Sequence, residues 1–406
     1  MPCIRLRHPS VPSNLIGWTL VDSTGRPRYW ATVWTALDGA ALQGSTLSEY
    51  LRAIESLYLA VERQTGKDCL DKLIAELDFD DLEKALEGHF VYQRNHATQT
   101  FQPSQGWRLA VGFVSTCVSR LAKSSDRTLD SIHHRLLRLD QLYTSLQMPR
   151  SKRSETVRAL PAAVVEDLYD VLTPGSTRNP FRTKSLQWRN FSIILLMLHQ
   201  GLRRSEVLAL PADAIKQEWV SNKQLPRCWL DIAANPYERV DPRADPARLK
   251  NHYATRQIPA SSDLAGLIET YRTSYRGKPS HSYLFTSQTG APLSKRSINV
   301  ICSTLSSSLK PSAVTELKRL RKIAYIRPHD FRHTCAVMRL RQFVDAGTDM
   351  DMALQKLRVL FGWSRTSTMP QRYARAYFEE RLATVWQDAF EVHVDALRRL
   401  EGVSNQ

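Results

Sequence analysis

The spacing of apolar residues predicts helices along most of the chain. Thr46 and Glu49 have the spacing of a capping box, and the apolar positions around and after them recur every three or four residues, which is the pattern of an amphipathic helix. These apolar positions are Leu47, Leu51, Ile54, Leu57, Tyr58 and Val61. Comparable patterns cover residues 69–77, 80–91, 107–121 and 129–146. Residues 43–147 are therefore expected to form a small helical domain.

The residues before this domain favour β-structure. Within residues 16–36, two β-favouring runs flank a Ser-Thr-Gly turn, so we expect a β-hairpin in an N-terminal extension of residues 1–42. Its aromatic side chains could stack on nucleic-acid bases, but aromatic residues on a hairpin more often pack on their own domain, and we favour packing. The residues concerned are Trp18, Tyr29, Trp30 and Trp34.

A basic segment poor in apolar residues follows the helical domain. Residues 148–158 are expected to form an interdomain linker. Its basic side chains could follow a phosphate backbone or could simply keep a spacer solvated, and the sequence leaves both roles open. These side chains are Arg150, Lys152, Arg153 and Arg158.

A second domain is expected over residues 159–406. Helical periodicity opens it, and an apolar helix over residues 188–200 ends at Gly201. Two strands around residues 228–232 and 255–260 are expected to flank a loop, and helices then resume. The predicted fold class is mainly α with a small antiparallel β-sheet (α+β).

The charge balance favours a phosphate-rich partner. Lysine and arginine number 56 against 40 aspartate and glutamate, a formal net charge of +16 that favours nucleic acid but does not exclude a merely basic enzyme.

The six cysteines lack paired spacing, which argues against a zinc cluster or disulfide scaffold and favours a reducing, cytoplasmic setting. No signal-peptide pattern opens the chain, and the prominent apolar run of residues 193–198 is too short for a bilayer, so a soluble protein without membrane partners is expected.

The segment Arg-Pro-His-Asp-Phe-Arg-His-Thr, residues 327–334, is a candidate for phosphate chemistry. Pro328 fits the first turn of a helix, so His329 and Arg332 should share one face at i, i+3. Such a face can hold a phosphate oxygen and manage a proton. His329 and His333 also imitate a zinc-binding pair, but the glutamate of that motif is absent, so metal binding is disfavoured.

Two arginines follow the apolar helix in Gly-Leu-Arg-Arg-Ser-Glu, residues 201–206. The planar fork of arginine suits the paired oxygens of a phosphate, although surface solvation would explain a single arginine equally well. Glu206 could orient one of the two guanidinium groups.

In chain order, these motifs resemble the tyrosine recombinase (phage integrase) family. The order is Gly-Leu-Arg-x-Ser-Glu, a lysine in a β-hairpin, His-x-x-Arg-His-Thr, Gly-His/Trp and a tyrosine. The motifs cover residues 157–400, while residues 45–147 resemble the family's core-binding domain only in helical pattern. The resemblance implies a two-lobed DNA clamp, with a helical core-binding domain and a mixed α/β catalytic domain around the duplex.

The resemblance also assigns roles to individual residues. Arg203 matches the first catalytic arginine and Arg332 the second, so both are expected to hold the non-bridging oxygens of the scissile phosphate. His329 is expected to assist proton transfer. Lys250, followed by a turn slightly longer than usual, matches the lysine that protonates the leaving 5′ oxygen. No cofactor and no metal are implied.

The remaining two positions depart slightly from the family pattern. Trp363 stands where most members have histidine; its indole N–H can donate to a phosphate oxygen but cannot titrate, and a packing role is the alternative. Tyr373 matches the nucleophile, which would form a 3′-phosphotyrosyl link, although it lies one residue farther along than usual. Tyr377 is the nearby competitor, and the residues before Tyr373 favour Tyr373.

The resemblance implies duplex DNA with specific recombination sites as the partner, a homo-tetramer on synapsed DNA, and accessory proteins. A final helix over residues 378–400 could dock on a neighbouring protomer or fold back. The expected function is site-specific recombination in integration, excision or transposition of a mobile element. The alternatives are a type IB topoisomerase-like enzyme, a catalytically silent DNA-binding protein on the same fold, and a metallohydrolase that uses His329 and His333.

Overall fold

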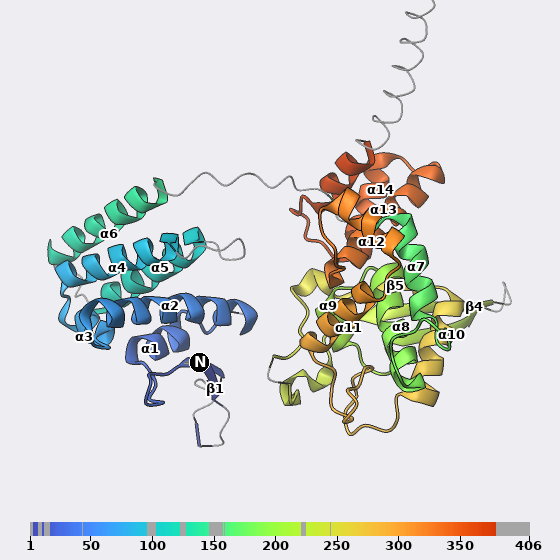
Figure 1. Ribbon diagram of the computed structural model, residues 1–406, viewed down its shortest axis with the longest axis horizontal. Helices are drawn as coiled ribbons and strands as arrows, with labels where there is room; N and C mark the ends of the chain where they lie inside the picture. Colours follow the sequence, from blue (N-terminus) through green and yellow to red (C-terminus); the bar gives the residue numbers. More distant parts are fainter. Residues whose placement is uncertain are drawn as a thin grey trace, which may run out of the picture. The chain divides into compact units, whose positions relative to one another are not determined.

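The computed structural model describes residues 3–6, 10–11, 17–42, 44–95, 103–121, 127–145, 157, 159–220, 225–243 and 245–378. The chain divides into two compact units, residues 1–153 and 154–406 (Figure 1). Both are rich in helices and carry small antiparallel sheets, which confirms the predicted fold class. Within the described part, no helix has the length and apolar character needed to cross a membrane.

The first unit contains the helices that the apolar periodicity predicts. Its elements are β1 (Cys3–Leu6), β2 (Gly17–Leu20), α1 (Tyr29–Leu37), α2 (Gly44–Thr65), α3 (Leu70–Glu76), α4 (Phe79–Asn95), α5 (Pro103–Leu121) and α6 (Arg127–Ser145). Their buried faces form one apolar core, in which Trp107 is fully buried and lies edge-on to Phe90. The helices at residues 69–77, 80–91, 107–121 and 129–146 are thus confirmed, with ends shifted by a few residues.

The expected hairpin over residues 16–36 is wrong in its second half. β2 pairs with β1, and the chain makes the expected turn, in which the Gly25 N–H donates to the Asp22 carbonyl. It then enters helix α1 instead of a strand. Trp30 and Trp34 are four positions apart and both buried, so this aromatic run follows a helical period. The favoured packing role is confirmed for these two residues.

The second unit combines a helical core with a three-stranded sheet. Its helices are α7 (Ala162–Leu172), α8 (Lys184–His199), α9 (Arg204–Ala209), α10 (Ser262–Thr270), α11 (Lys295–Ser307), α12 (Pro311–Arg321), α13 (Pro328–Asp345) and α14 (Met350–Phe361). Shorter helical turns are η1 (Pro236–Val240), η2 (His252–Ala254) and η3 (Tyr271–Tyr275), and residues 369–378 are also helical. Helix α8 is buried along residues 192–198 and packs against α13, so the two helices form the centre of the unit.

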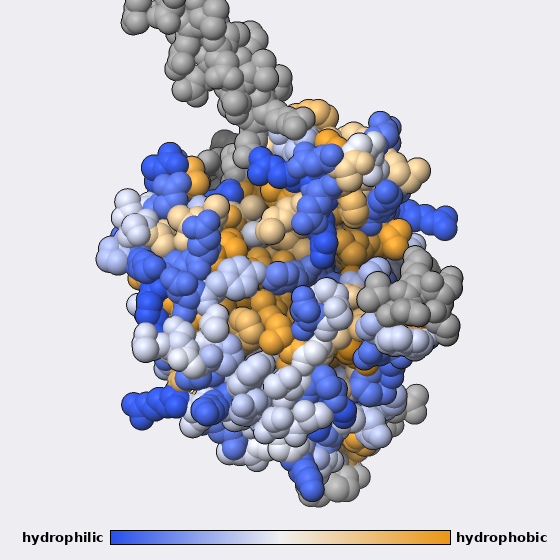
Figure 2. Space-filling model, turned by 90° about the vertical axis from the view of Figure 1, so that its right-hand side faces the viewer, coloured by the Kyte–Doolittle hydropathy of each residue, from blue (hydrophilic) through white to orange (hydrophobic). Residues whose placement is uncertain are grey.

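The sheet of the second unit consists of β3 (Ile215–Val220), β4 (Leu225–Ile232) and β5 (Arg256–Ala260), in that order and all antiparallel. The pairing of Ile232 with Arg256 begins the β4–β5 ladder. The two strands predicted around residues 228–232 and 255–260 are thereby confirmed. Figure 2 shows one face of this unit, where hydrophilic side chains interrupt the hydrophobic ones.

Two predicted segments fall almost entirely outside the described residues. They are the basic linker of residues 148–158, of which only Val157 is described, and the final helix of residues 378–400, of which only Phe378 is described.

Candidate functional site

Arg203 is delivered to the site by a turn that only glycine accommodates. After α8, Gly201 has a φ of +64°, and a Cβ built there would lie 2.4 Å from Cε1 of Phe361. Arg203 then becomes the residue that caps α9, where its backbone N–H donates to Oε2 of Glu206 at 3.0 Å. Its guanidinium Nη1 lies 2.5 Å from Oε1 of the same carboxylate. The motif at residues 201–206 therefore folds into one local unit.

Glu206 is the carboxylate around which three arginines gather. Its side chain is 1% exposed, and Arg203, Arg256 and Arg332 approach it at 2.5, 3.0 and 3.8 Å. Burial alone would raise the pKa of Glu206, but the positive charges of these three arginines lower it to about 2. The carboxylate is therefore ionised at neutral pH and neutralises part of the charge gathered here.

Arg332 is buried at the junction of the turn and the end of α14. It donates from Nη1 to the Gly201 carbonyl at 2.5 Å and from Nη2 to the Phe361 carbonyl at 2.6 Å. Burial lowers the pKa of Arg332, and the charge of Glu206 opposes this. The predicted pair, Arg203 and Arg332, is thus brought together through Glu206.

Arg256 is a member of this cluster that sequence reasoning missed. From the first residue of β5 it donates to Glu206 at 3.0 Å, to the Leu360 carbonyl at 2.8 Å and to the Ala254 carbonyl at 2.7 Å. Glu206 lies 50 positions from Arg256 along the chain, and Leu360 lies 104 positions from it. No local pattern in the sequence signals such contacts.

Trp363 lies in a stack of aromatic rings beside the arginines. Gly362 ends α14 in the left-handed region, with a φ of +58°, and the chain then places Trp363 between Phe361 and Tyr373. The centroid of the Trp363 ring lies 4.9 Å from that of Phe361 and 5.6 Å from that of Tyr373, and in both pairs the ring planes are nearly parallel. The guanidinium carbon of Arg332 lies 5.6 Å from the Trp363 ring centroid. Trp363 therefore lies beside Arg332 and also packs against two aromatic rings.

Tyr373 is directed at a histidine that the sequence interpretation set aside. Its side chain is 1% exposed, and its hydroxyl lies 2.7 Å from Nδ1 of His333. Burial raises the pKa of Tyr373, while the positive charges of Arg332 and Arg203 oppose the shift. In the sequence, His333 was marked by its place in the His-x-x-Arg-His-Thr motif and by its i, i+4 spacing from His329, and the ring centroids of the two histidines lie 4.7 Å apart on α13.

The competing tyrosine lies in the same apolar cluster. Tyr377 is buried one helical turn beyond Tyr373. Of the two, Tyr373 is the residue whose hydroxyl meets His333 and whose ring stacks on Trp363. This geometry favours Tyr373 as the nucleophile candidate.

Lys250 lies in the long connection between β4 and β5, not in a tight hairpin. It is exposed and comes just before η2. A Cβ built on Gly362 would lie 2.7 Å from the Tyr253 carbonyl oxygen, so the backbone of η2 lies close to the end of α14.

Arg204 differs from its neighbour Arg203 in its contacts. It points to α11 and donates to the side chain of Asn299 at 2.8 Å.

His329 and His333, the pair that imitates a zinc-binding motif, do not form part of a metal site within the described residues. Across the parts of the chain that the structure describes, no group of three or more histidine, cysteine, aspartate or glutamate residues is arranged to hold a metal ion. The rings of His329 and His333 instead lie edge to face, and His333 contacts the Tyr373 hydroxyl.

The site's motifs lie within a segment that matches a known family. The model of the phage integrase family matches residues 158–380, more than half of the chain. The chain belongs to the phage integrase family. This member, a tyrosine recombinase, matches no curated protein in sequence.

Three solved recombinase structures resemble this phage integrase family member at low identity. The crystal structure of XerA recombinase is 14% identical, covers 82% of this chain and 98% of its own, and has a TM-score of 0.35. XerH site-specific recombinase bound to difH substrate, a pre-cleavage complex, is 12% identical over 75% of this chain and 69% of its own, with a TM-score of 0.43. XerH bound to palindromic difH substrate, a post-cleavage complex, is 12% identical over 88% of this chain and 85% of its own, with a TM-score of 0.48.

Proposed function

We propose that this chain is a site-specific recombinase that cuts and rejoins duplex DNA during integration, excision or transposition of a mobile element. The observation that carries the proposal is the gathering of Arg203 and Arg332 on one carboxylate, beside the buried hydroxyl of Tyr373, in a phage integrase family member. Two guanidinium forks suit the oxygens of a single phosphate, and a phenol oxygen is a nucleophile suited to attack it.

In the proposed reaction, the Tyr373 oxygen forms a bond to the scissile phosphorus, and the bond from phosphorus to the 5′ oxygen breaks. The products are a 3′-phosphotyrosyl link and a free 5′-hydroxyl. The phenol proton passes to Nδ1 of His333, which lies 2.7 Å away, and His329 assists this transfer. Lys250 gives a proton to the 5′ oxygen. Reversal of these steps on another strand yields recombination, without a metal or cofactor.

The arginines contribute charge stabilisation where the transition state develops negative charge. Removal of one preorganised donor of this kind commonly costs about 3 to 4 kcal/mol, or roughly a hundredfold to a thousandfold in rate. Trp363 supports the phosphate site by stacking on Tyr373 and lying beside Arg332.

Both parts of the chain are proposed to bind duplex DNA. Residues 43–147 would act as the core-binding domain after the extension of residues 1–42, and residues 159–406 as the catalytic domain, with the basic segment of residues 148–158 between them. A net charge of +16 supports contact with a phosphate backbone. We further propose a homo-tetramer on two synapsed sites, in which the final helix docks on a neighbouring protomer, in the cytoplasm and with accessory proteins.

The near alternative is a topoisomerase-like enzyme, in which the same residues cleave and reseal one strand. The helical first unit, preceding a catalytic segment with the family's motif order, favours recombination. The two activities differ in whether the 3′-phosphotyrosyl end is joined to a strand of a second duplex.

Covalent capture tests the proposal. Nicked suicide duplexes that tile the DNA flanking the encoding gene are incubated with the full chain in excess EDTA, and protein–DNA adducts are resolved under denaturing conditions. We expect an adduct on the duplex that carries the site, its loss in Tyr373→Phe, and its retention in the matched variant Tyr377→Phe. An adduct that persists in Tyr373→Phe would overturn the assignment of the nucleophile, and no adduct on any duplex would overturn the proposed reaction. Adding a second labelled duplex with a free 5′-hydroxyl then separates recombination from resealing.

A further inference from the structure

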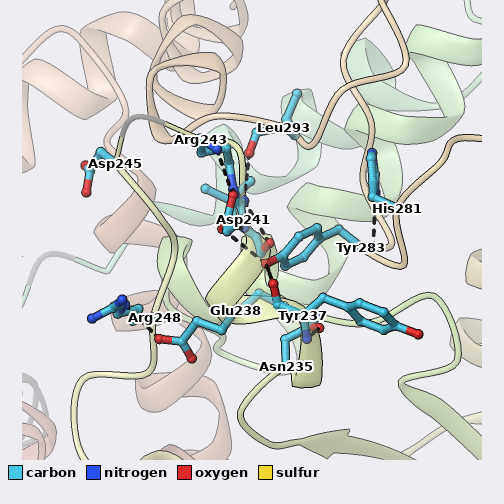
Figure 3. Close-up of polar contacts among 12 residues, drawn as sticks. Asn235, Tyr237, Glu238, Asp241, Arg243, Asp245, Arg248, His281, Tyr283 and Leu293 are labelled. Carbon is cyan, nitrogen blue, oxygen red and sulfur yellow. Dashed lines mark hydrogen bonds and ion pairs between the residues drawn. The ribbon is translucent and has the colours of Figure 1, made fainter. Parts of the chain in front are cut away.

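The connection between β4 and β5, which carries Lys250, is held in place by a buried polar cluster (Figure 3). Long connections without regular structure are usually mobile surface segments. This one instead places Asp241 and Arg243 in the interior, where both are at least nine-tenths buried. Such burial is costly for charged side chains unless each is paired and hydrogen-bonded.

Arg243 uses its whole guanidinium group within the cluster. Its Nε and Nη2 donate to the carboxylate of Asp241 at 3.0 and 2.7 Å, and its Nη1 donates to the carbonyls of Leu208 and Leu293 at 3.0 Å each. The Tyr283 hydroxyl donates to Asp241 at 3.1 Å, and the guanidinium lies 4.3 Å from the Tyr283 ring centroid. Figure 3 shows these side chains converging on Asp241.

Two hydrogen bonds join this connection to α9, the helix that begins directly after Arg203. The Leu208 carbonyl, which Arg243 binds, and the Ala209 carbonyl, which the Asn235 side chain binds at 2.9 Å, belong to the last turn of α9. Carbonyls at a helix end have no partner within the helix. The connection supplies those partners, so its position is tied directly to the short helix that Arg203 caps.

Ion pairs continue along the connection towards Lys250. Asp245 binds Lys295 of α11 at 2.6 Å, and Arg248, two residues before Lys250, binds Glu238 at 2.7 Å. On the other side of Lys250, Arg256 binds Glu206. Before Lys250, the connection is therefore bonded to α9 and α11, and after Lys250 it is bonded to Glu206 of α9.

We infer that Arg243, paired with Asp241, is a positioning residue for Lys250. A buried ion pair contributes little net stability relative to apolar residues of the same volume. The bonds of this pair instead fix the distance between the lysine-bearing connection and α9. The inference rests on the proposed function, in which Lys250 protonates the leaving 5′ oxygen.

A substrate that does not need this proton tests the inference. Suicide duplexes are prepared with sulfur in place of the bridging 5′ oxygen at the scissile phosphate, since a thiolate leaves without protonation near neutral pH. Single-turnover cleavage by Lys250→Ala should fall about a hundredfold on the oxygen substrate and recover on the sulfur substrate. Arg243→Lys, which keeps the charge but loses the fork, should fall roughly tenfold on the oxygen substrate and likewise recover. Arg203→Ala should remain slow on both substrates.

Controls separate positioning from folding. Arg178→Lys, the same change at a half-buried arginine that pairs with the buried Asp167 on α7, should cleave both substrates as the unaltered chain does. If Arg243→Lys melts early, the double variant Asp241→Leu/Arg243→Met retains volume without the charges, and it should show the same sulfur recovery. Arg243 variants slowed equally on both substrates, or not slowed at all, would overturn the inference alone. Failure of Lys250→Ala to recover on sulfur would overturn the proposed role of Lys250 and, with it, the inference.

Discussion

The hydroxyl oxygen of Tyr373 lies 2.7 Å from Nδ1 of His333. His333 follows Arg332 on α13, so one helix supplies both the buried guanidinium beside the stacked rings and the imidazole at the phenol. Since burial raises the pKa of Tyr373, the phenol stays protonated at neutral pH and needs a neighbouring proton acceptor to attack. The imidazole of His333, with Nδ1 at the phenol oxygen, is placed for that step.

Replacing His333 with glutamine should slow cleavage by about a hundredfold at neutral pH, because an amide can hydrogen-bond to the phenol but cannot take up its proton. The rate of the variant should rise steadily with pH, since the raised pKa of Tyr373 delays ionisation of the phenol to strongly alkaline solution. Single-turnover cleavage measured from pH 6 to 9 checks this. A His333→Gln enzyme with the rate and pH profile of the unaltered chain would contradict the proton transfer.

The two adjacent arginines should differ sharply in importance. Arg203→Ala should reduce cleavage roughly a hundredfold to a thousandfold, because it removes one of the two guanidinium groups that are gathered on Glu206 and that we propose hold the phosphate. Arg204→Ala should change it little, since Arg204 instead binds Asn299 on α11. Cleavage rates and melting temperatures of both variants test the contrast, and an equal loss of activity in the two would remove the distinction.

Stability should depend on the ionisation of Glu206. Its pKa is about 2 in the folded chain against an ordinary value of 4.5, so its stabilising contribution is complete above about pH 4.5 and is lost as pH falls through 2. The difference corresponds to about 3 kcal/mol for this buried carboxylate. Glu206→Gln should therefore lower the free energy of unfolding by about this amount at pH 7, and the loss should shrink as the pH falls below 4.

Urea unfolding at several pH values measures this effect. Glu269→Gln is the matched control, because Glu269 pairs with Arg272 at the surface of α10 and should leave the free energy of unfolding nearly unchanged. A Glu206→Gln penalty that is the same at pH 3 and pH 7 would show that the charge of Glu206 is not its source.

The sequence predicted those parts of the site that local patterns encode. Helical period and proline placement located α13, and motif order located Arg203, Arg332, Trp363 and Tyr373, which the fold brings into one cluster. Arg256 escaped prediction because its partners, Glu206 and the Leu360 carbonyl, are distant in sequence and meet only through the packing of β5 against α14.

Other differences also come from tertiary packing. His333 was considered only as a metal ligand, because its contact with the Tyr373 hydroxyl, 40 positions further on, forms only in the folded chain. The second strand of the hairpin expected over residues 16–36 became α1 because β-favouring aromatics such as Trp30 and Trp34 gained more by burying one helical face in the core.

Gly201 should be among the glycines least tolerant of a side chain. Gly201→Ala forces an alanine into a φ of +64° and brings its Cβ to 2.4 Å from Phe361, whose ring supports Trp363. The backbone strain should cost about 1 to 2 kcal/mol, and the overlap roughly 1 to 3 kcal/mol more. Gly175→Ala shares the positive φ, at +86°, but has open space around the new Cβ, so it should cost the strain alone. Urea unfolding of both variants separates the two contributions. Because the overlap displaces Phe361, Gly201→Ala should also slow cleavage, and equal unfolding penalties for the two alanines would refute the packing of Gly201 against that ring.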